Sequence, residues 1–232
     1  MLVIRAGVAL VAAVGVIPEP RARAARSRLT PVGVLRNCGG VLKNTRFLGM
    51  SLSAGLLMGT LFGYISASAF VFMTYFGLSA SNYSLIFAVN SVGMILAGQL
   101  NLYLCRKMSS RRNLAFGFTV HLFFTAALLA AVAAGFDSLE IVGVLLFLAT
   151  SSLCLLFGGI TAESMYSVEH SRAGSASAVL GVLQYAIGGG AGLVLGLVHN
   201  NTLIPLVVLM AACSTLSLCS WALAADKKLP LA

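Results

Sequence analysis

Charged residues are scarce in this sequence, and acidic residues are the scarcest. Only 9% of the 232 residues are charged, whereas 59% are hydrophobic. Soluble domains are about 25% charged and roughly half apolar, so the composition excludes a large soluble domain and predicts a membrane protein. The 15 Lys and Arg outnumber the 6 Asp and Glu, but the basic residues stand between apolar runs. We therefore interpret them as membrane-topology signals and expect no nucleic-acid partner.

The motifs of metal, disulfide and hydrolytic chemistry are also lacking. The 5 cysteines form no CxxC pair, and the 3 histidines lie far apart without an HExxH motif, so we expect no disulfide framework, no metal and no cofactor. An intramembrane serine protease is a less favoured alternative, because its nucleophile needs a partnered base. The nearest approach to a GxSG motif, residues 49–52, reads Gly-Met-Ser-Leu and fails. We expect no enzymatic activity.

The sequence contains six long apolar runs. A bilayer core of about 30 Å needs about 20 helical residues per crossing. Each run is continuously apolar rather than alternating, which predicts helices rather than the strands of a membrane barrel. The predicted fold is all-α, with a six-helix transmembrane domain over residues 47–225 whose spans are 47–75, 83–104, 114–135, 141–161, 173–198 and 203–225.

A shorter apolar run precedes these spans. Residues 6–17 are too few to cross a bilayer, and we interpret residues 1–17 as the remnant of a preceding transmembrane helix. The alternative is a signal peptide, but its cleavage would leave a strongly basic stretch on the outer side. Residues 18–46 are expected to form a basic cytoplasmic loop, and residues 226–232 a cytoplasmic tail.

Basic residues are confined to one side of the predicted bundle. Every Lys and Arg except Arg5 lies between residues 17 and 47, between 104 and 114, between 161 and 173, or after 225. The alternate connections, residues 76–82, 136–140 and 199–202, contain none. By the positive-inside rule, the basic side and the C-terminus are expected to be cytoplasmic.

Two spans carry glycine at every fourth position, which places the glycines on one helix face. Such a stripe lets the backbone of another helix approach closely. We interpret the stripes as static packing surfaces, with a sliding contact that moves during transport as the alternative. The helix-packing candidates are Gly55, Gly59 and Gly63 in one span and Gly188, Gly192 and Gly196 in the other.

Polar side chains inside the spans also cluster by face. An amide that faced lipid would be costly, so these side chains are expected to point into the bundle, where they either make interhelical hydrogen bonds or line a polar cavity. The substrate-cavity candidates are Tyr64, Ser68, Tyr75, Asn90, Gln99, Gln184 and Tyr185. Spans 114–135 and 203–225 are almost entirely apolar and are expected to face lipid.

Carboxylates are missing from the depth of every predicted span. A proton- or sodium-coupled transporter normally keeps such a group at membrane depth, so this chain lacks an obvious coupling residue. His121 can titrate, but a lone histidine on an apolar helix is more often simply hydrogen-bonded.

Three segments carry a family resemblance: residues 63–71, GYISASAFV; residues 83–101, which include FAVN and GQLN; and residues 173–184, AGSASAVLGVLQ. They resemble the C-terminal half of the bicyclomycin-resistance (Bcr/CflA) drug/proton antiporters, which belong to the major facilitator superfamily. The resemblance covers nearly the whole chain and matches its six spans to the seventh to twelfth helices of that family.

The resemblance implies a twelve-helix transporter of two halves, with substrate carried at the midplane between them. This chain would be the C-terminal half, and proton coupling would depend on an N-terminal half. The family implies small apolar or amphipathic drugs and protons as transported partners, the lipid bilayer as surroundings, and the bacterial inner membrane as location. One departure is Ser68-Ala69-Phe70, where the family usually has Ser-Pro-Phe.

The resemblance also assigns a possible role to the basic cluster after the second span. The cluster lies where the superfamily repeats its gating-loop motif, so it is a candidate for pairing with acidic residues that close the inner face. The alternative is that the basic cluster only sets the orientation of the helices in the membrane. The cytoplasmic gate candidates are Arg106, Arg111, Arg112, Glu163 and Glu169.

The sequence therefore predicts a transmembrane transporter that performs multidrug efflux by drug/proton antiport, with this chain as its C-terminal half. A non-transporting membrane fragment or interaction partner is the alternative.

Overall fold

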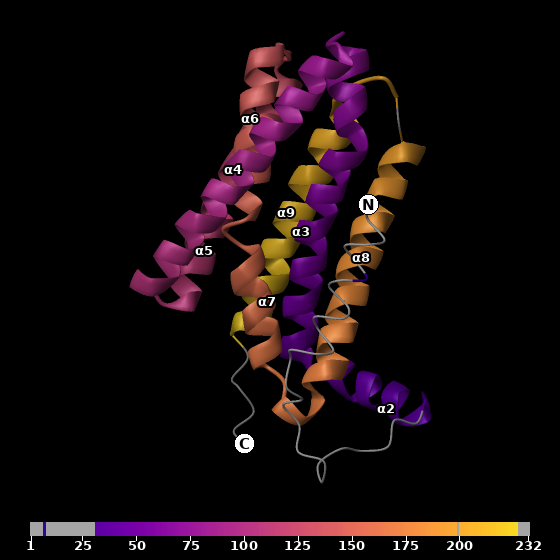
Figure 1. Ribbon diagram of the computed structural model, residues 1–232, viewed down its shortest axis with the longest axis vertical. Helices are drawn as coiled ribbons and strands as arrows, with labels where there is room; N and C mark the ends of the chain where they lie inside the picture. Colours follow the sequence, from indigo (N-terminus) through magenta and orange to yellow (C-terminus); the bar gives the residue numbers. More distant parts are fainter. Residues whose placement is uncertain (1–6, 8–30, 199, 227–232) are drawn as a thin grey trace. The chain divides into compact units, whose positions relative to one another are not determined.

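The computed structural model describes residue 7, residues 31–198 and residues 200–226 (Figure 1). The chain divides into two compact units, Met1–Leu35 and Arg36–Ala232, and the packing given below is that of the second. The expected helix remnant over residues 1–17, apart from Gly7, lies outside the described residues, as do residues 18–30 of the basic loop and the tail beyond residue 226. The described part of that loop is largely helical, because α2 covers Pro31–Leu42.

Six spans long and apolar enough to cross a membrane follow α2, which confirms the predicted fold class. The described residues form no β-strand. A 3-10 turn, η3 at His170–Arg172, precedes the fifth span. In chain order the spans are α3 (Thr45–Ala69) continued by the π-helix η2 (Phe70–Tyr75), α4 (Ala80–Lys107), α5 (Ser110–Ala133), α6 (Leu139–Leu153) with α7 (Phe157–Tyr166), α8 (Ala173–Leu197) and α9 (Ile204–Ala225).

Short polar and glycine connections begin and end the spans. The Asn44 side chain caps α3 by accepting the backbone N–H groups of Arg46 and Phe47, both at 3.1 Å. Such caps satisfy N–H groups that the first helical turn leaves free. Gly77 and Gly135 have φ values of 68° and 79°, in the left-handed region that favours glycine, so the chain reverses at these points.

The fourth span was expected as one continuous helix over residues 141–161, and this expectation is wrong. α6 ends at Leu153, and α7 begins at Phe157. Between them, the N–H groups of residues 154, 155 and 156 bond to carbonyls three residues earlier, at 2.9 to 3.1 Å, which is a tighter winding than an α-helix. The Ser152 hydroxyl donates to the Ala149 carbonyl at 2.7 Å and so competes with regular helix bonding. Neither Pro nor Gly occurs between residues 151 and 157 to signal the break.

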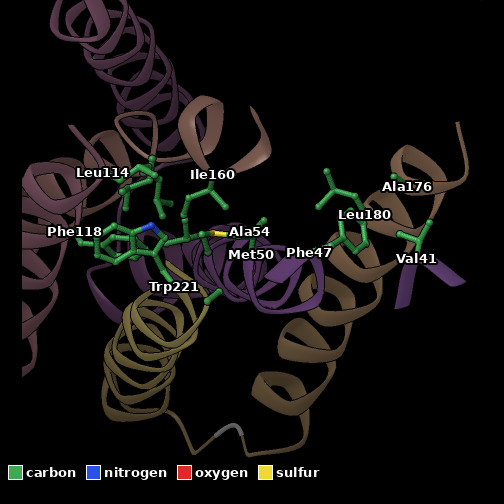
Figure 2. Close-up of a cluster of buried hydrophobic side chains, with 14 residues drawn as sticks. Val41, Phe47, Met50, Ala54, Leu114, Phe118, Ile160, Ala176, Leu180 and Trp221 are labelled. Atoms are coloured by element: carbon green, nitrogen blue, oxygen red, sulfur yellow. The ribbon is translucent and has the colours of Figure 1, made fainter. Parts of the chain in front are cut away.

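α3 is the central helix of the second unit. It packs most extensively against α8 and α9 and also contacts α7, while α5 packs against α6 and α9, and α4 against α6 (Figure 1). One apolar cluster joins the start of α3 to α5, α7, α8 and α9 (Figure 2). Within it the rings of Phe118 and Trp221 lie 5.2 Å apart between centroids. A second cluster around Tyr64, Phe72 and Met210 holds the other end of the helices together.

Burial against other parts of this chain differs between the spans, and the expectation that spans 114–135 and 203–225 face lipid stays a prediction. In the apolar stretch of α9, 39% of residues are buried, against 17% for α4 and 28% for both α5 and α8. α9 is buried because its small polar residues face its neighbours: Ser53 and Ser217 exchange hydrogen bonds of 2.8 to 2.9 Å between α3 and α9. Small side chains of this kind let membrane helices approach closely.

Candidate substrate-binding region

Tyr64 on α3 and Asn90 on α4 form a buried polar pair. Their side chains are 2% and 4% exposed, and the Asn90 amide donates a hydrogen bond to the Tyr64 hydroxyl. The Tyr64 ring also stacks on Phe87, with 6.4 Å between centroids. The pair places two of the predicted cavity residues in contact, as an interhelical hydrogen bond.

Ser68 extends this polar contact one turn along α3. It is fully buried, and its hydroxyl lies 2.9 Å from both the Ile65 carbonyl and the Tyr83 hydroxyl on α4. The sequence analysis did not single out Tyr83. Tyr83 lies 15 residues after Ser68, on the far side of the connection at residues 76–79. Only the folded arrangement of the two helices reveals the contact.

Tyr75 does not join this group, although the expected α-helical spacing placed it on the same face. The reason is η2, because a π-helical turn contains more residues than an α-helical turn and so rotates everything that follows. Tyr75 is 37% exposed, and its hydroxyl donates to the Asp137 carboxylate at 2.5 Å. It therefore ties the end of the first span to the α5–α6 connection.

The other three cavity candidates lie apart from the Tyr64–Asn90 pair. Gln99 is exposed on α4, and Gln184 is half-buried on α8. Tyr185 is 65% exposed and meets Phe62 edge-on, with 6.2 Å between ring centroids. The candidates therefore do not converge on one closed cavity within this chain.

A cavity of about 400 Å³ does open beside Asn90, between η2, α4 and α6. Asn90 thus serves both of the alternatives that the sequence left open, because it bonds across helices and also lines a cavity. Most of the wall is apolar, and Glu140 stands in it near the start of α6. We call this cavity the α4–α6 groove; it is lined by Phe72, Leu85, Ile86, Val89, Asn90, Leu139, Glu140, Gly143, Val144 and Phe147.

His121 is the hub of a second buried polar network, on α5. It is fully buried; its Nδ1 lies 2.9 Å from the Ser152 hydroxyl and its Nε2 lies 2.8 Å from the Ser214 hydroxyl. The network joins α5 to the broken end of α6 and to α9. The interpretation of His121 as a hydrogen-bonded histidine agrees with this geometry, but its serine partners were not identified from the sequence.

A contact between two asparagines was also not predicted from the sequence. The Asn113 amide at the start of α5 donates to the Asn101 side-chain oxygen on α4 at 2.7 Å, and both residues are buried. The sequence signal for this contact was that the two asparagines flank one short basic connection.

The glycine stripes lie mainly at helix contacts of α3. A Cβ at Gly55 would lie 2.5 Å from Ile187 and 3.2 Å from the Leu183 carbonyl on α8, and a Cβ at Gly192 would lie 2.9 Å from the Ser66 hydroxyl on α3. The positions of Gly59, Gly63 and Gly188 are also tight. Gly196 is different, because a Cβ there would meet nothing within 4 Å.

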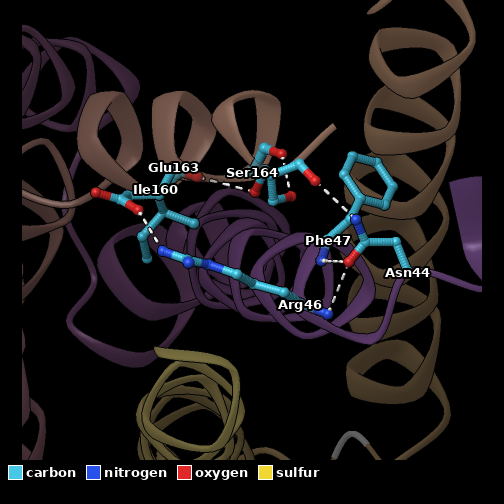
Figure 3. A network of polar contacts seen from close by, with 7 residues as sticks. Asn44, Arg46, Phe47, Ile160, Glu163 and Ser164 are labelled. Atoms are coloured by element: carbon cyan, nitrogen blue, oxygen red, sulfur yellow. Dashed lines mark hydrogen bonds and ion pairs between the residues drawn. The ribbon is translucent and has the colours of Figure 1, made fainter. Parts of the chain in front are cut away.

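The charged candidates near the opposite end of the bundle have partners other than those expected. Glu163 on α7 pairs with Arg46 at 3.3 Å, next to the Asn44 amide, which donates to the Ser167 carbonyl at 2.7 Å (Figure 3). Glu169 accepts a hydrogen bond from Ser171 at 3.2 Å. The structure therefore does not pair the basic cluster with either glutamate.

Within the basic cluster itself, Arg111 pairs with Asp226 at 3.0 Å, and both side chains are largely exposed. Arg106 and Arg112 are also exposed. Among the described residues, no group of three His, Cys, Asp or Glu side chains could hold a metal ion.

Comparison with known proteins identifies two similar bacterial sequences, while no family model matches the chain. The chain is 25% identical to a bicyclomycin resistance protein homologue of Haemophilus influenzae over 211 residues, which is 89% of this chain and 51% of the relative. It is 24% identical to an uncharacterized MFS-type transporter, YdgK, of Bacillus subtilis over 176 residues, which is 76% of this chain and 43% of the relative. The chain spans about half the length of these relatives.

These similarities confirm the resemblance to bicyclomycin-resistance proteins and to the major facilitator superfamily. The six apolar helices agree with a multi-pass membrane protein that has the fold of half such a transporter. The names of both relatives indicate transport or drug resistance rather than an enzyme.

Proposed function

We propose that this chain is the C-terminal half of a drug/proton antiporter of the bacterial inner membrane. The observation that carries the proposal is the match of 89% of the chain to a relative named for bicyclomycin resistance. Six helices long and apolar enough to cross a bilayer support it.

A second six-helix half completes the proposed transport path. The chain spans about half the length of its relatives, and α4 and α8 are little buried by their own unit. Gln99, Gln184 and Tyr185 lie on these two helices and are at least partly exposed. An amide facing lipid is costly, so a polar path between two halves is a better environment for these side chains.

Substrate contact is proposed at two places on this half's side of the path. Tyr64, Ser68 and Asn90 supply a polar band between α3 and α4, and Gln184 and Tyr185 supply an amide and an aromatic group from α8. Apolar surroundings with few polar groups suit small apolar or amphipathic drugs.

Proton coupling is assigned to the other half. Every described carboxylate lies in a connection, a first turn or a helix close to the charged end of the bundle: Asp137, Glu140, Glu163, Glu169 and Asp226. The Arg46–Glu163 pair is instead proposed to help close the cytoplasmic end of the path, and the exposed Arg106, Arg111 and Arg112 to anchor the topology.

Drug accumulation in bacterial cells tests the proposal. We expect the 232-residue chain alone to leave accumulation of a fluorescent drug unchanged, and co-expression with a matching N-terminal half to lower it. Gln184→Leu, alone or with Asn90→Leu, should weaken the effect of the two halves together. Thr215→Leu is the matched control, because Thr215 is exposed on α9 and its hydroxyl bonds to Ala211 of its own helix at 2.8 Å.

Two outcomes would overturn the proposal. If the chain alone lowers accumulation and the double variant abolishes that effect, the chain is a self-sufficient homodimeric exporter. If no matching half lowers accumulation, although both halves are present in the membrane, the chain is a non-transporting fragment or interaction partner.

A further inference from the structure

A largely apolar groove of about 270 Å³ runs between the start of α3 and the end of α9. We call it the α3–α9 groove. Small residues form its floor, because a Cβ at Gly49 would lie only 2.7 Å from the Ala224 Cβ and 3.4 Å from the Ser220 carbonyl. Side chains of this size let two membrane helices approach closely, so the floor of the groove is tightly closed.

Leucines form the walls of the α3–α9 groove. Leu48 and Leu52 on α3 are half-buried, and Leu223 on α9 is 73% exposed. The groove runs along α3 from the exposed Thr45 to Leu52, which is about 10 Å at the α-helical rise. One leaflet contributes about half of the 30 Å hydrocarbon core. The groove therefore has a length that fits within a single leaflet.

The charge at the mouth of the groove is positive. Lys43 is exposed two residues before Thr45, and within the described part of the chain it pairs with no carboxylate. The other charges close to the mouth along the chain are compensated. Arg46 pairs with Glu163, and Asp226, at the end of α9, pairs with Arg111. The lysine is therefore left to attract an anion.

From this geometry we propose that the α3–α9 groove holds one acyl chain of an anionic phospholipid, from the leaflet at the basic end of the bundle. The acyl chain lies over the small residues of the floor, between the leucine walls. The phosphate lies against Lys43 and the Thr45 hydroxyl. Anionic lipids attract basic residues at the membrane surface, and the exposed Leu223 suits hydrocarbon. The site does not depend on the proposed transport function, because it uses none of the proposed substrate contacts.

Photolabelling of the full chain in phosphatidylcholine nanodiscs tests this site. The probes are phosphatidylglycerol and phosphatidylcholine, each with a diazirine in one acyl chain, and the labelled residues are mapped by mass spectrometry. We expect the anionic probe to label Leu48, Leu52 and Leu223 more strongly than the neutral probe does, and unlabelled phosphatidylglycerol to displace it. Lys43→Gln should weaken labelling by the anionic probe about fivefold, since a basic residue near an anionic surface contributes about 1 kcal/mol.

Matched variants separate the groove from general contact with lipid. Leu223→Ala removes a wall and should lower labelling of α3. Leu216→Ala should leave this labelling unchanged, because Leu216 is 56% exposed on the same face of α9 two turns earlier but does not line the groove. Arg106→Gln, at an exposed position on α4, should leave the preference for the anionic probe unchanged.

Three results would overturn the proposal. Equal labelling of the groove by the two probes would show the contact that any bilayer lipid makes. An undiminished preference for the anionic probe in Lys43→Gln protein would contradict the assigned position of the phosphate. Undiminished labelling of α3 in folded Leu223→Ala protein would contradict the position of the acyl chain. Because the readout is binding, failure of drug efflux would not affect it.

Discussion

Histidine at position 121 shows how one side chain can join three helices. His121 contacts Ser152 on α6 and Ser214 on α9, and both serines also donate to carbonyls of their own helices. The serines therefore keep a hydrogen bond when the histidine is removed. The contribution of His121 is the connection between helices rather than the satisfaction of polar groups.

Replacing His121 should destabilise the bundle in a graded way. Interhelical hydrogen bonds in membranes contribute about 0.6 kcal/mol each on average, so His121→Leu, which keeps most of the volume, should cost roughly 1 kcal/mol of unfolding free energy. His121→Ala adds a cavity and should cost about 2 kcal/mol or more. Unfolding by a denaturing detergent measures both values.

Thr119→Ala is the control for this series. Thr119 lies on the same helix, is exposed, and bonds to the Ala115 carbonyl of its own helix, so little change is expected. Equal losses for Thr119→Ala and His121→Leu would contradict the role of the network.

At the scale of elements, the α3–α8 contact depends on the absence of side chains. Gly55 and Gly59 on α3, and Gly188 and Gly192 on α8, leave no room for a side chain without displacement of a neighbour. Close approach of this kind increases the van der Waals contact on which membrane helices rely, because lipid provides no hydrophobic driving force between them. The glycine spacing therefore has a packing role at these positions.

Leucine at the tight glycine positions should loosen this interface. Gly55→Leu and Gly192→Leu should each cost about 1 to 3 kcal/mol through overpacking, with the larger effect at Gly55, where the Leu183 backbone carbonyl cannot rotate away. Folded yield after detergent extraction and detergent-induced unfolding are the measurements.

Gly196→Leu is a control from the same stripe, since position 196 has open space. It should behave like the unsubstituted chain. Comparable damage at positions 55, 192 and 196 would contradict the packing role, because a Cβ at position 196 has no close neighbour.

Across the whole molecule, the charges are segregated by end. The described Lys and Arg lie at the end where α3 begins and α9 ends, while Asp137 and Glu140 lie at the other. The proposed orientation, with the basic end in the cytoplasm, follows from this asymmetry.

Cysteine labelling of intact cells tests that orientation. A membrane-impermeant thiol reagent should label a cysteine introduced at Ser138 or Asn200, both exposed at the end without basic residues. It should not label native Cys105, although Cys105 is exposed next to the basic cluster. Labelling of Cys105 from outside, with Ser138→Cys unlabelled, would reverse the topology.

The number and positions of the spans follow from the sequence alone, because a helix that crosses lipid must be continuously apolar over a fixed length. The sequence also predicts that the striped glycines pack against another helix, since a spacing of four places them on one helix face. Gly196 shows the limit of that argument, because spacing gives the face but not where the neighbouring helix leaves it.

Which polar groups meet depends on how the helices wind and pack. The π-helix η2 turned Tyr75 away from Ser68, the break after Leu153 placed Ser152 against His121, and Glu163 paired with Arg46 rather than with the basic cluster. Local winding and partner choice depend on contacts between segments far apart in the chain, and a one-dimensional pattern does not contain those contacts. The α4–α6 groove has the same origin, because its lining residues come from η2, α4 and α6.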